Sequence, residues 1–267
     1  MTASGGARYA DRMRRFLRQA IPLLLLSLLG LALFAWPLTG ASLLAATGLA
    51  SSQRASAAEQ RVREDLTTRL RAIGSDWGAP VFVRIYKQEH ELELWTRTGS
   101  GDHALLDTWP ICTFSGELGP KQREGDGQAP EGVYQVSRGQ LNPYSSYHLS
   151  FDLGYPNAFD RAHRRTGGYL MVHGSCVSIG CYAMTDAGIE QIYSLLAAAL
   201  ASGQRSVQVH ALPFRFKPGW ERRHATSPWL DFWRDLAAID AAFERTHTPP
   251  AVTLRGDRYA LANPAPP

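Results

Sequence analysis

The chain has 267 residues, of which 45% are hydrophobic and 19% are charged, a balance that is typical of a folded globular protein and excludes a disordered one. Its formal net charge is +4, from 28 lysines and arginines against 24 acidic residues, and five of the arginines lie before position 19. The remainder shows no patch of basic and aromatic residues, which argues against nucleic acid as a partner.

The first 54 residues differ in character from the rest of the chain. An uncharged apolar run from Ile21 to Trp36 follows five arginines, namely Arg8, Arg12, Arg14, Arg15 and Arg18. This order is typical of an export signal or a membrane anchor. The uncharged stretch 38–50 can extend the run to the roughly 20 residues that a span needs, which favours an anchor. The small-residue pattern at 55–57 permits cleavage instead, so both alternatives stay open. In either case we expect the arginines to stay in the cytoplasm and the remainder to cross the membrane.

Short strands and a few helices are predicted beyond this segment. Leu66 and Leu70 belong to an apolar series at helical spacing over residues 55–73, and residues 55–78 are expected to connect the N-terminal segment to a domain over 79–215. Strands are predicted over residues 81–86, 91–96, 105–113, 132–136, 168–172 and 207–210. Helices are predicted over 186–201, with Thr185 as the N-cap, and over 228–245. Residues 216–267 are expected to hold the last helix and a loose Pro/Ala-rich tail. The predicted fold class is α+β, a mainly-β core with added helices.

Two long segments, 116–132 and 142–168, are predicted as loops because they are rich in Gly, Pro and polar residues. A loop as long as the second one is commonly a binding element in a compact domain. Its side chains that suit a polar substrate are Tyr144, Tyr147, His148, Tyr155, Asn157, Asp160 and Arg161. Any one of them can instead pack the loop onto the domain.

The segment from His173 to Cys181 carries the strongest chemical signal. An imidazole can take the proton of a neighbouring thiol and form a thiolate–imidazolium pair, and the strand that ends at 172 places His173 where a sheet gives way to a loop. Gly174 and Gly180 allow tight turns that bring backbone N–H groups close to a reacting carbonyl. The alternatives are a structural histidine, a buried cysteine, or a metal site that includes Cys176, whose spacing is unlike that of zinc knuckles.

The chain has three cysteines, Cys112, Cys176 and Cys181. Three cysteines fit an oxidising compartment only if one stays free, and a disulfide between Cys112 and Cys176 with a reactive Cys181 is one such arrangement. The sequence leaves the pairing open. It contains no phosphate-binding glycine loop, and neither a cofactor nor a metal is expected.

Several separated motifs resemble those of the YkuD-type L,D-transpeptidase catalytic domain. His173-Gly174 followed by Ser178-Ile179-Gly180-Cys181 is similar to the His-Gly…Ser-x-Gly-Cys signature of that family. Residues 110–121, 130–134, 140–143 and 145–151 add similarity to its YafK/DpaA branch. The resemblance covers roughly residues 80–215, about half of the chain.

The resemblance implies a β-sandwich-like core with the cysteine in a loop above it. It also implies that the substrates are the stem peptides of bacterial peptidoglycan, reached in the periplasm. In the family, the cysteine attacks the bond between a diamino acid and D-alanine, and an amine resolves the resulting thioester. The YafK/DpaA branch is associated with the release of an outer-membrane lipoprotein from the wall by water, and with stimulation of sister transpeptidases.

Carried over residue by residue, the resemblance makes Cys181 the nucleophile and His173 the general base that later returns its proton. The backbone carbonyl of Gly174 orients the imidazole, and the backbone N–H groups of Gly180 and Cys181 form the oxyanion hole. Ser178 is expected to shape the loop. Together with Ser178, the residues expected to bind the substrate are Tyr147, His148, Tyr155 and Arg161.

Two departures from the family pattern lie near the predicted nucleophile. Many members carry a histidine where this chain has Ile179, and an arginine where it has Ala183. Both changes remove polar groups near the acyl site, which puts ordinary crosslinking in doubt.

We therefore expect an exported cysteine enzyme that acts on stem-peptide amide bonds at the diaminopimelate centre. It is expected in the periplasm, either anchored in the inner membrane or released from it. We consider three hypotheses for its function. They are transfer of the acyl group to an amine, hydrolysis that frees a wall-linked lipoprotein, and non-enzymatic regulation of other L,D-transpeptidases. The intact His173 and Cys181 disfavour the third, since a pure binding module needs neither.

Overall fold

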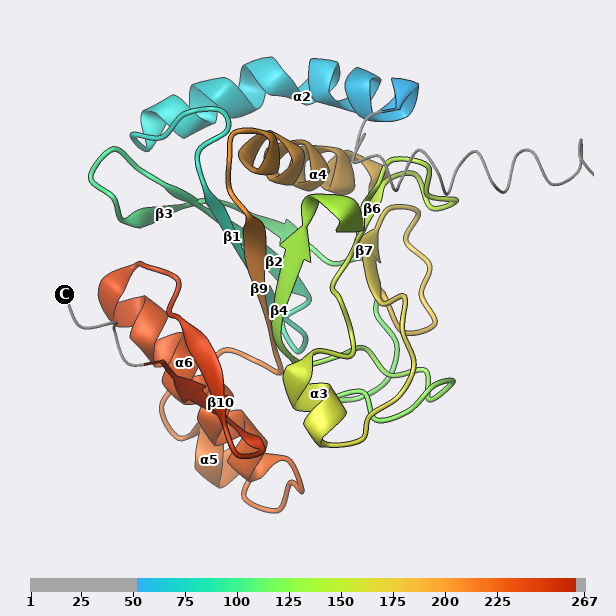
Figure 1. The fold of residues 1–267 in the computed structure, drawn as a ribbon, viewed down its shortest axis with the longest axis vertical. Coiled ribbons are helices and arrows are strands. Elements are labelled where there is room, and N and C mark those ends of the chain that lie inside the picture. Colours follow the sequence, from blue (N-terminus) through green and yellow to red (C-terminus); the bar gives the residue numbers. More distant parts are fainter. Residues whose placement is uncertain (1–51, 263–267) are drawn as a thin grey trace, which may run out of the picture. The chain divides into compact units, whose positions relative to one another are not determined.

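The computed structural model describes residues 52–262 (Figure 1). The predicted signal or anchor segment therefore lies outside the described residues, apart from its last three positions. Within residues 52–262, no helix combines the length and the apolar character that a bilayer crossing requires.

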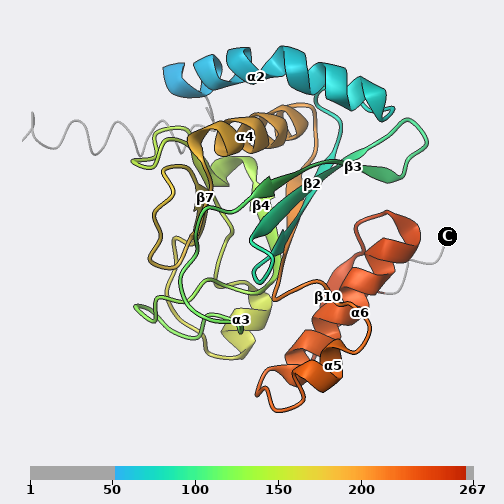
Figure 2. The same cartoon turned by 180° about the vertical axis from the view of Figure 1, so that it is seen from behind.

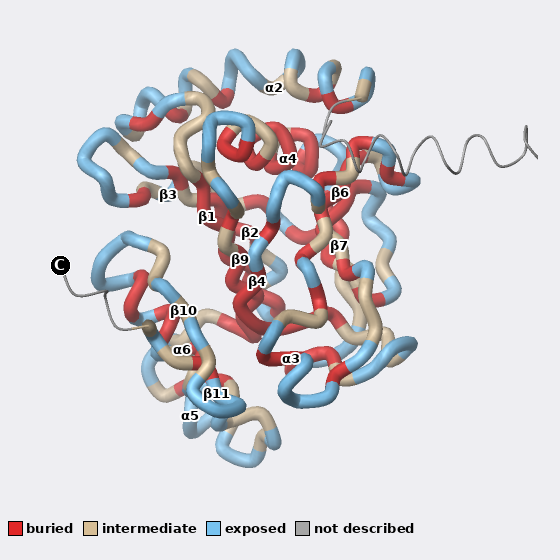
Figure 3. Tube along the Cα trace, in the orientation of Figure 1, coloured by how far each residue is buried: buried red, intermediate tan, exposed pale blue. Residues whose placement is uncertain are grey.

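The central element is a five-stranded mixed sheet in the order β3-β2-β1-β9-β4. Its strands are β1 (Val81–Tyr86), β2 (Glu91–Arg97), β3 (His103–Pro110), β4 (Gly132–Ser137) and β9 (Ser206–Leu212). β1 and β9 run parallel, and the other neighbours pair antiparallel. Every residue of β1 is buried, as expected for a central strand that is covered on both faces. Figure 3 shows buried residues concentrated on β1, β9 and α4.

A second sheet of four short strands lies beside the first and positions the segment from His173 to Cys181. Its order is β5 (Leu141–Asn142), β6 (Ser150–Asp152), β7 (Met171–His173) and β8 (Tyr182–Ala183). The segment 142–168, predicted as one long loop, therefore contains strand β6 and the short helix α3 (Ala158–Ala162). The α+β class is confirmed, with two mixed sheets and several helices.

Helix α4 (Asp186–Ala201) packs on the sheets, and helix α2 (Gln53–Ala72) packs on α4 (Figures 1 and 2). The predicted N-cap of α4 is confirmed, because Thr185 Oγ accepts a hydrogen bond of 3.0 Å from Gly188 N. On α2, Leu66 and Leu70 are fully buried in the core cluster that also includes α4. The helix expected to be a connector is therefore also part of the folded core.

The C-terminal region packs around a second, aromatic-rich cluster that includes Trp233 and Phe214. It comprises α5 (Trp220–Arg223), α6 (Leu230–Thr246) and an antiparallel hairpin of β10 (Val252–Arg255) and β11 (Arg258–Leu261). The loose tail predicted for the last twenty residues is wrong over 252–261. Apolar alternation and a turn at Gly256, whose φ of 65° favours glycine, produce the hairpin.

Candidate active site

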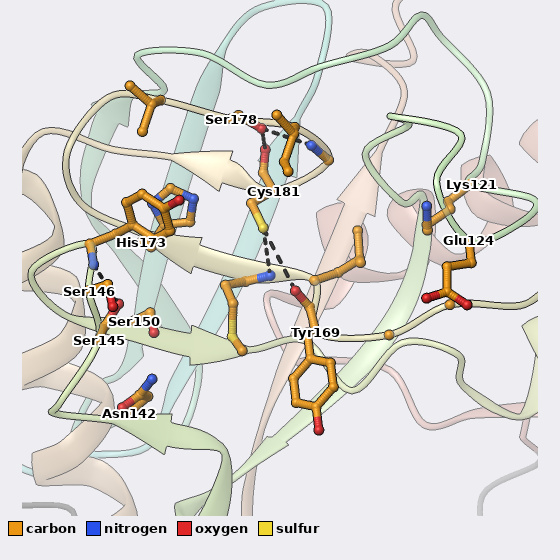
Figure 4. Close-up of a pocket in the computed structure, with 18 of the residues that line it drawn as sticks. Lys121, Glu124, Asn142, Ser145, Ser146, Ser150, Tyr169, His173, Ser178 and Cys181 are labelled. Carbon is orange, nitrogen blue, oxygen red and sulfur yellow. Dashed lines mark hydrogen bonds between the residues drawn. The ribbon is translucent and has the colours of Figure 1, made fainter. Parts of the chain in front are cut away.

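His173 and Cys181 are brought together by the parallel pairing of β7 with β8. His173 is the last residue of β7 and pairs with Ala183, whereas Cys181 directly precedes β8. Paired residues of neighbouring strands share a face and alternate residues return to it, so both side chains point to the same side of the sheet. Figure 4 shows them at one pocket of about 860 Å³.

The imidazole of His173 is held in one tautomer. Its Nδ1 lies 2.6 Å from the carbonyl oxygen of Gly174, which can only accept, so Nδ1 carries the proton and Nε2 keeps its lone pair. The ring of Tyr147 stacks on it at a centroid distance of 4.7 Å. Burial lowers the pKa of His173, although the bond to Gly174 opposes this effect. His173 is therefore a neutral base at neutral pH.

The thiol of Cys181 is also neutral in the free protein. Burial raises its pKa above the ordinary cysteine value, while the hydrogen bond from Met171 N, 3.3 Å long, acts in the opposite direction. The thiol donates to the carbonyl of Tyr169 at 3.8 Å, and within residues 52–262 no hydrogen bond joins it to His173. The expected thiolate–imidazolium pair is thus not the resting state, and attack requires proton transfer as the bond to sulfur forms.

Ser178 and Gly180 fix the turn that precedes the thiol. Ser178 Oγ donates to the carbonyl of Cys181 at 2.7 Å and accepts from Gly180 N at 3.1 Å. Gly180 has a φ of 141°, which favours glycine. Ser178 thus shapes the loop. The N–H of Gly180, expected to stabilise an oxyanion, is occupied by Ser178 in the free protein and reaches a reacting oxygen only by releasing this bond.

The other two cysteines are joined in a disulfide between Cys112 and Cys176. Cys176 therefore supplies neither a rival thiolate nor a metal ligand, and the alternative of a zinc site with His173 and Cys181 is wrong. In the part of the chain that the structure describes, no group of three or more His, Cys, Asp or Glu side chains is arranged to hold a metal ion.

The expected substrate-binding residues divide into two groups. Tyr147 and Ser178 line the pocket that contains Cys181, whereas three others do not. His148 Nε2 lies 2.7 Å from Glu190 Oε1, and Tyr155 donates from its hydroxyl to the carbonyl of Lys121. Arg161 donates to the carbonyl of Pro156 and borders a different pocket.

The pocket also contains residues that were not predicted to bind the substrate. They come from strands β5 and β6 and from loops far apart in the chain, and they include Lys121, Glu124, Asn142, Ser145, Ser146, Ser150, Tyr169, Val177 and Ile179. Tyr169 and Ile179 are 83% and 90% exposed at its rim. Exposed large hydrophobic residues beside a free thiol indicate a binding surface. Their exposure is known only from the folded structure, so the sequence could not reveal it.

Comparison with known proteins agrees with the motifs and the geometry. Residues 80–209 match the YkuD L,D-transpeptidase catalytic domain. The chain is also 48% identical over 187 residues to YafK of Escherichia coli K12, an alignment that covers 70% of this chain and 76% of YafK. The chain belongs to the L,D-transpeptidase family. YafK of Escherichia coli O157:H7 matches equally well.

Two solved structures resemble this L,D-transpeptidase-family protein more distantly. The helical cell shape determining protein Pgp2 of Campylobacter jejuni is 20% identical, with a TM-score of 0.42 over 67% of this chain and 64% of Pgp2. Bd1075 of Bdellovibrio bacteriovorus is 18% identical, with a TM-score of 0.38 over 62% of this chain and 61% of Bd1075. The chain thus spans less than two thirds of each, and these likenesses carry no further argument.

Substitution of Gly174 by alanine is expected to destabilise this L,D-transpeptidase domain at the residue whose carbonyl accepts the hydrogen bond from His173. A Cβ at this position would lie 2.5 Å from Asp186 Oδ1, 3.0 Å from His148 Cβ and 3.1 Å from Ile189 Cγ2, so either these side chains or the backbone must shift. Overpacking of this kind costs about 1–3 kcal/mol. Urea unfolding of Gly174→Ala measures the loss of unfolding free energy. Gly139→Ala is the matched control, because a Cβ at that position meets no atom within 4 Å. Equal stability of the two variants would contradict the expected clash.

The rate of Cys181 alkylation by iodoacetamide is expected to rise with pH through a midpoint above about 8.5, the ordinary thiol pKa. The raised pKa of Cys181 leaves little thiolate at pH 7, and thiolate is the species that reacts. Because Cys112 and Cys176 are joined in the disulfide, the labelled site is unambiguous. A midpoint below 8 would instead mean that the ion pair exists in the free protein.

Proposed function

We propose that this protein is a peptidoglycan enzyme that cleaves a stem-peptide amide bond at the diaminopimelate centre through a thioester on Cys181. The observation that supports this most is the free thiol on the same face as His173, whose Nδ1 is bound to Gly174. As sulfur bonds to the carbonyl carbon, Nε2 of His173 takes the thiol proton. When the C–N bond breaks, the same proton goes to the leaving amine. An amine or water then releases the acyl group.

Hydrolysis of a protein-linked stem peptide is the second candidate function. Tyr169, Val177 and Ile179 form an exposed apolar rim at the pocket, with exposed fractions of 83%, 54% and 90%. Ile179 stands where many family members have a polar histidine. An exposed apolar rim is typical of a surface that contacts another polypeptide. It supports a wall-linked lipoprotein as the substrate.

The proposed site of action is the periplasm. The Cys112–Cys176 disulfide supports an oxidising compartment, and the basic and apolar segment before residue 54 supports export, with either anchoring in the inner membrane or cleavage. Other L,D-transpeptidases are further candidate partners.

The test is to incubate the purified protein with lipoprotein-bearing sacculi and with tetrapeptide muropeptides, and to identify the products by mass spectrometry. Crosslinked dimers between two diaminopimelate residues support the transferase, and released lipoprotein supports the hydrolase. No product from either substrate, while Cys181 reacts with small electrophiles, would contradict the proposal and favour the regulator.

A further inference from the structure

One wall of the Cys181 pocket is a loop of residues 143–149, which we call the wall loop. Ser145, Ser146 and Tyr147 of this loop line the pocket, and the Tyr147 ring stacks on His173. The loop also contacts the backbone that holds the imidazole, because Gly174 N donates to the carbonyls of Tyr147 at 3.0 Å and Leu149 at 3.2 Å. The position of the wall loop therefore bears directly on the position of His173.

The beginning of helix α2 holds the wall loop through its backbone. Arg54 Nη1 donates to the carbonyl of Ser145 at 2.8 Å and to that of His148 at 2.6 Å. Ser52, the N-cap of α2, donates from Oγ to the carbonyl of Pro143 at 2.9 Å. These bonds span more than ninety positions of sequence, so only the docked helix supplies them.

A second set of contacts holds His148 in an unfavourable backbone conformation. His148 has a φ of 66°, which residues other than glycine adopt rarely. Its ring binds Glu190 on α4, which Arg61 of α2 contacts with two nitrogens. Burial acts to raise the pKa of Glu190, but the bonds from Arg61 and His148 outweigh it and leave the pKa below its ordinary value. Glu190 is therefore an ionised link between α2 and the wall loop.

We infer that Arg54 and Arg61 of helix α2 are positioning residues for the reaction, acting through the wall loop on Tyr147 and His173. Neither arginine lines the pocket. Because a displacement of about 1 Å at a reacting group can cost up to about a hundredfold in rate, loss of the bonds to the wall loop is expected to slow acylation of Cys181. This inference rests on the proposed function only for the roles of His173 and Cys181.

The same contacts bear on processing of the N-terminal segment. The small-residue pattern at 55–57 lies in the first turns of α2, where Ala55 is buried. A cut after Ala57 would remove Ser52 and Arg54, and with them their hydrogen bonds to the carbonyls of Pro143, Ser145 and His148. The active chain therefore retains residues 52–57. Intact-mass analysis of protein isolated from cells tests this, and a fully active chain that begins at residue 58 would overturn it.

The main test uses p-nitrophenyl acetate, a small acylating ester that needs no peptidoglycan. Release of p-nitrophenolate reports attack by Cys181, so this assay works even if the proposed natural reaction is wrong. Arg54→Ala in the full chain is expected to slow acylation about ten- to a hundredfold with an unchanged melting temperature, since Arg54 is exposed. Arg54→Lys, which keeps one donor, is expected to recover part of the rate. Arg61→Ala tests the second link, and Arg63→Ala on the same helix is the control that should keep the wild-type rate.

A double-mutant cycle separates positioning from a general structural effect. If Arg54 acts through His173, adding Arg54→Ala to His173→Gln causes no further loss of acylation rate. Additive losses would overturn the inference, and so would a wild-type acylation rate in both Arg54→Ala and Arg61→Ala. Absence of any peptidoglycan product together with non-additive acylation rates would count against the proposed function alone.

Discussion

Cys181→Ala is expected to lower the rate of the peptidoglycan reaction by at least about a thousandfold, because no thioester can form without the thiol. Cys181 is the free thiol of the chain, and its Sγ lies in the pocket with His173. Mass spectrometry of wild-type protein mixed with substrate should show an acyl adduct on the peptide containing Cys181, and the variant should show none.

The control instead removes the two disulfide-bonded cysteines. The double variant Cys112→Ser, Cys176→Ser loses the disulfide and the stability it provides, but it keeps the nucleophile. It is expected to retain acyl-adduct formation at a temperature where circular dichroism shows it folded. An adduct on Cys112 or Cys176, or turnover by Cys181→Ala, would mean that the wrong thiol has been assigned.

His173→Gln is expected to lower the rate by about 10²–10⁴-fold, the usual contribution of a general base. Glutamine can still bind the carbonyl of Gly174, but it offers no lone pair of comparable basicity at the position of Nε2. The loss should appear in kcat, since the proton moves only as sulfur attacks.

The pH dependence gives a second signature of His173. Burial lowers the pKa of this imidazole, so the base stays unprotonated down to below about pH 6.5 and activity falls only on further acidification. The residual activity of His173→Gln should lack this acid limb. His163→Gln, at an exposed histidine outside the pocket, is the control and should keep both rate and profile. An unchanged acid limb in His173→Gln would assign the titration to another group.

The reactive segment was predictable because its determinants are local. His173 and Cys181 are eight positions apart, and the glycines and Ser178 that shape their turn lie in the same short stretch. Two neighbouring strands suffice to put both side chains on one face. The family resemblance includes this stretch and several separate motifs between residues 110 and 151, each of which can be recognised from its own residues.

The substrate-binding residues were less predictable because side-chain direction in a loop depends on distant partners. His148 and Tyr155 have the right chemistry for a polar substrate, but Glu190 binds the first and the backbone of Lys121 binds the second. Those partners lie 42 and 34 positions away in the chain. Spacing within the loop therefore carries no information about which ring faces the pocket.

The sequence by itself determined the family, the α+β class and the cap of helix α4, because motifs, hydrophobic periodicity and a capping residue are each legible in short stretches of sequence. Only the tertiary structure decided that Cys181 and His173 are both neutral at rest, since burial by the whole domain shifts their pKa values in opposite directions. It also decided that Arg54, about 120 positions before His173 in the chain, binds the backbone of the pocket's wall loop, because long-range docking of α2 brings the two together.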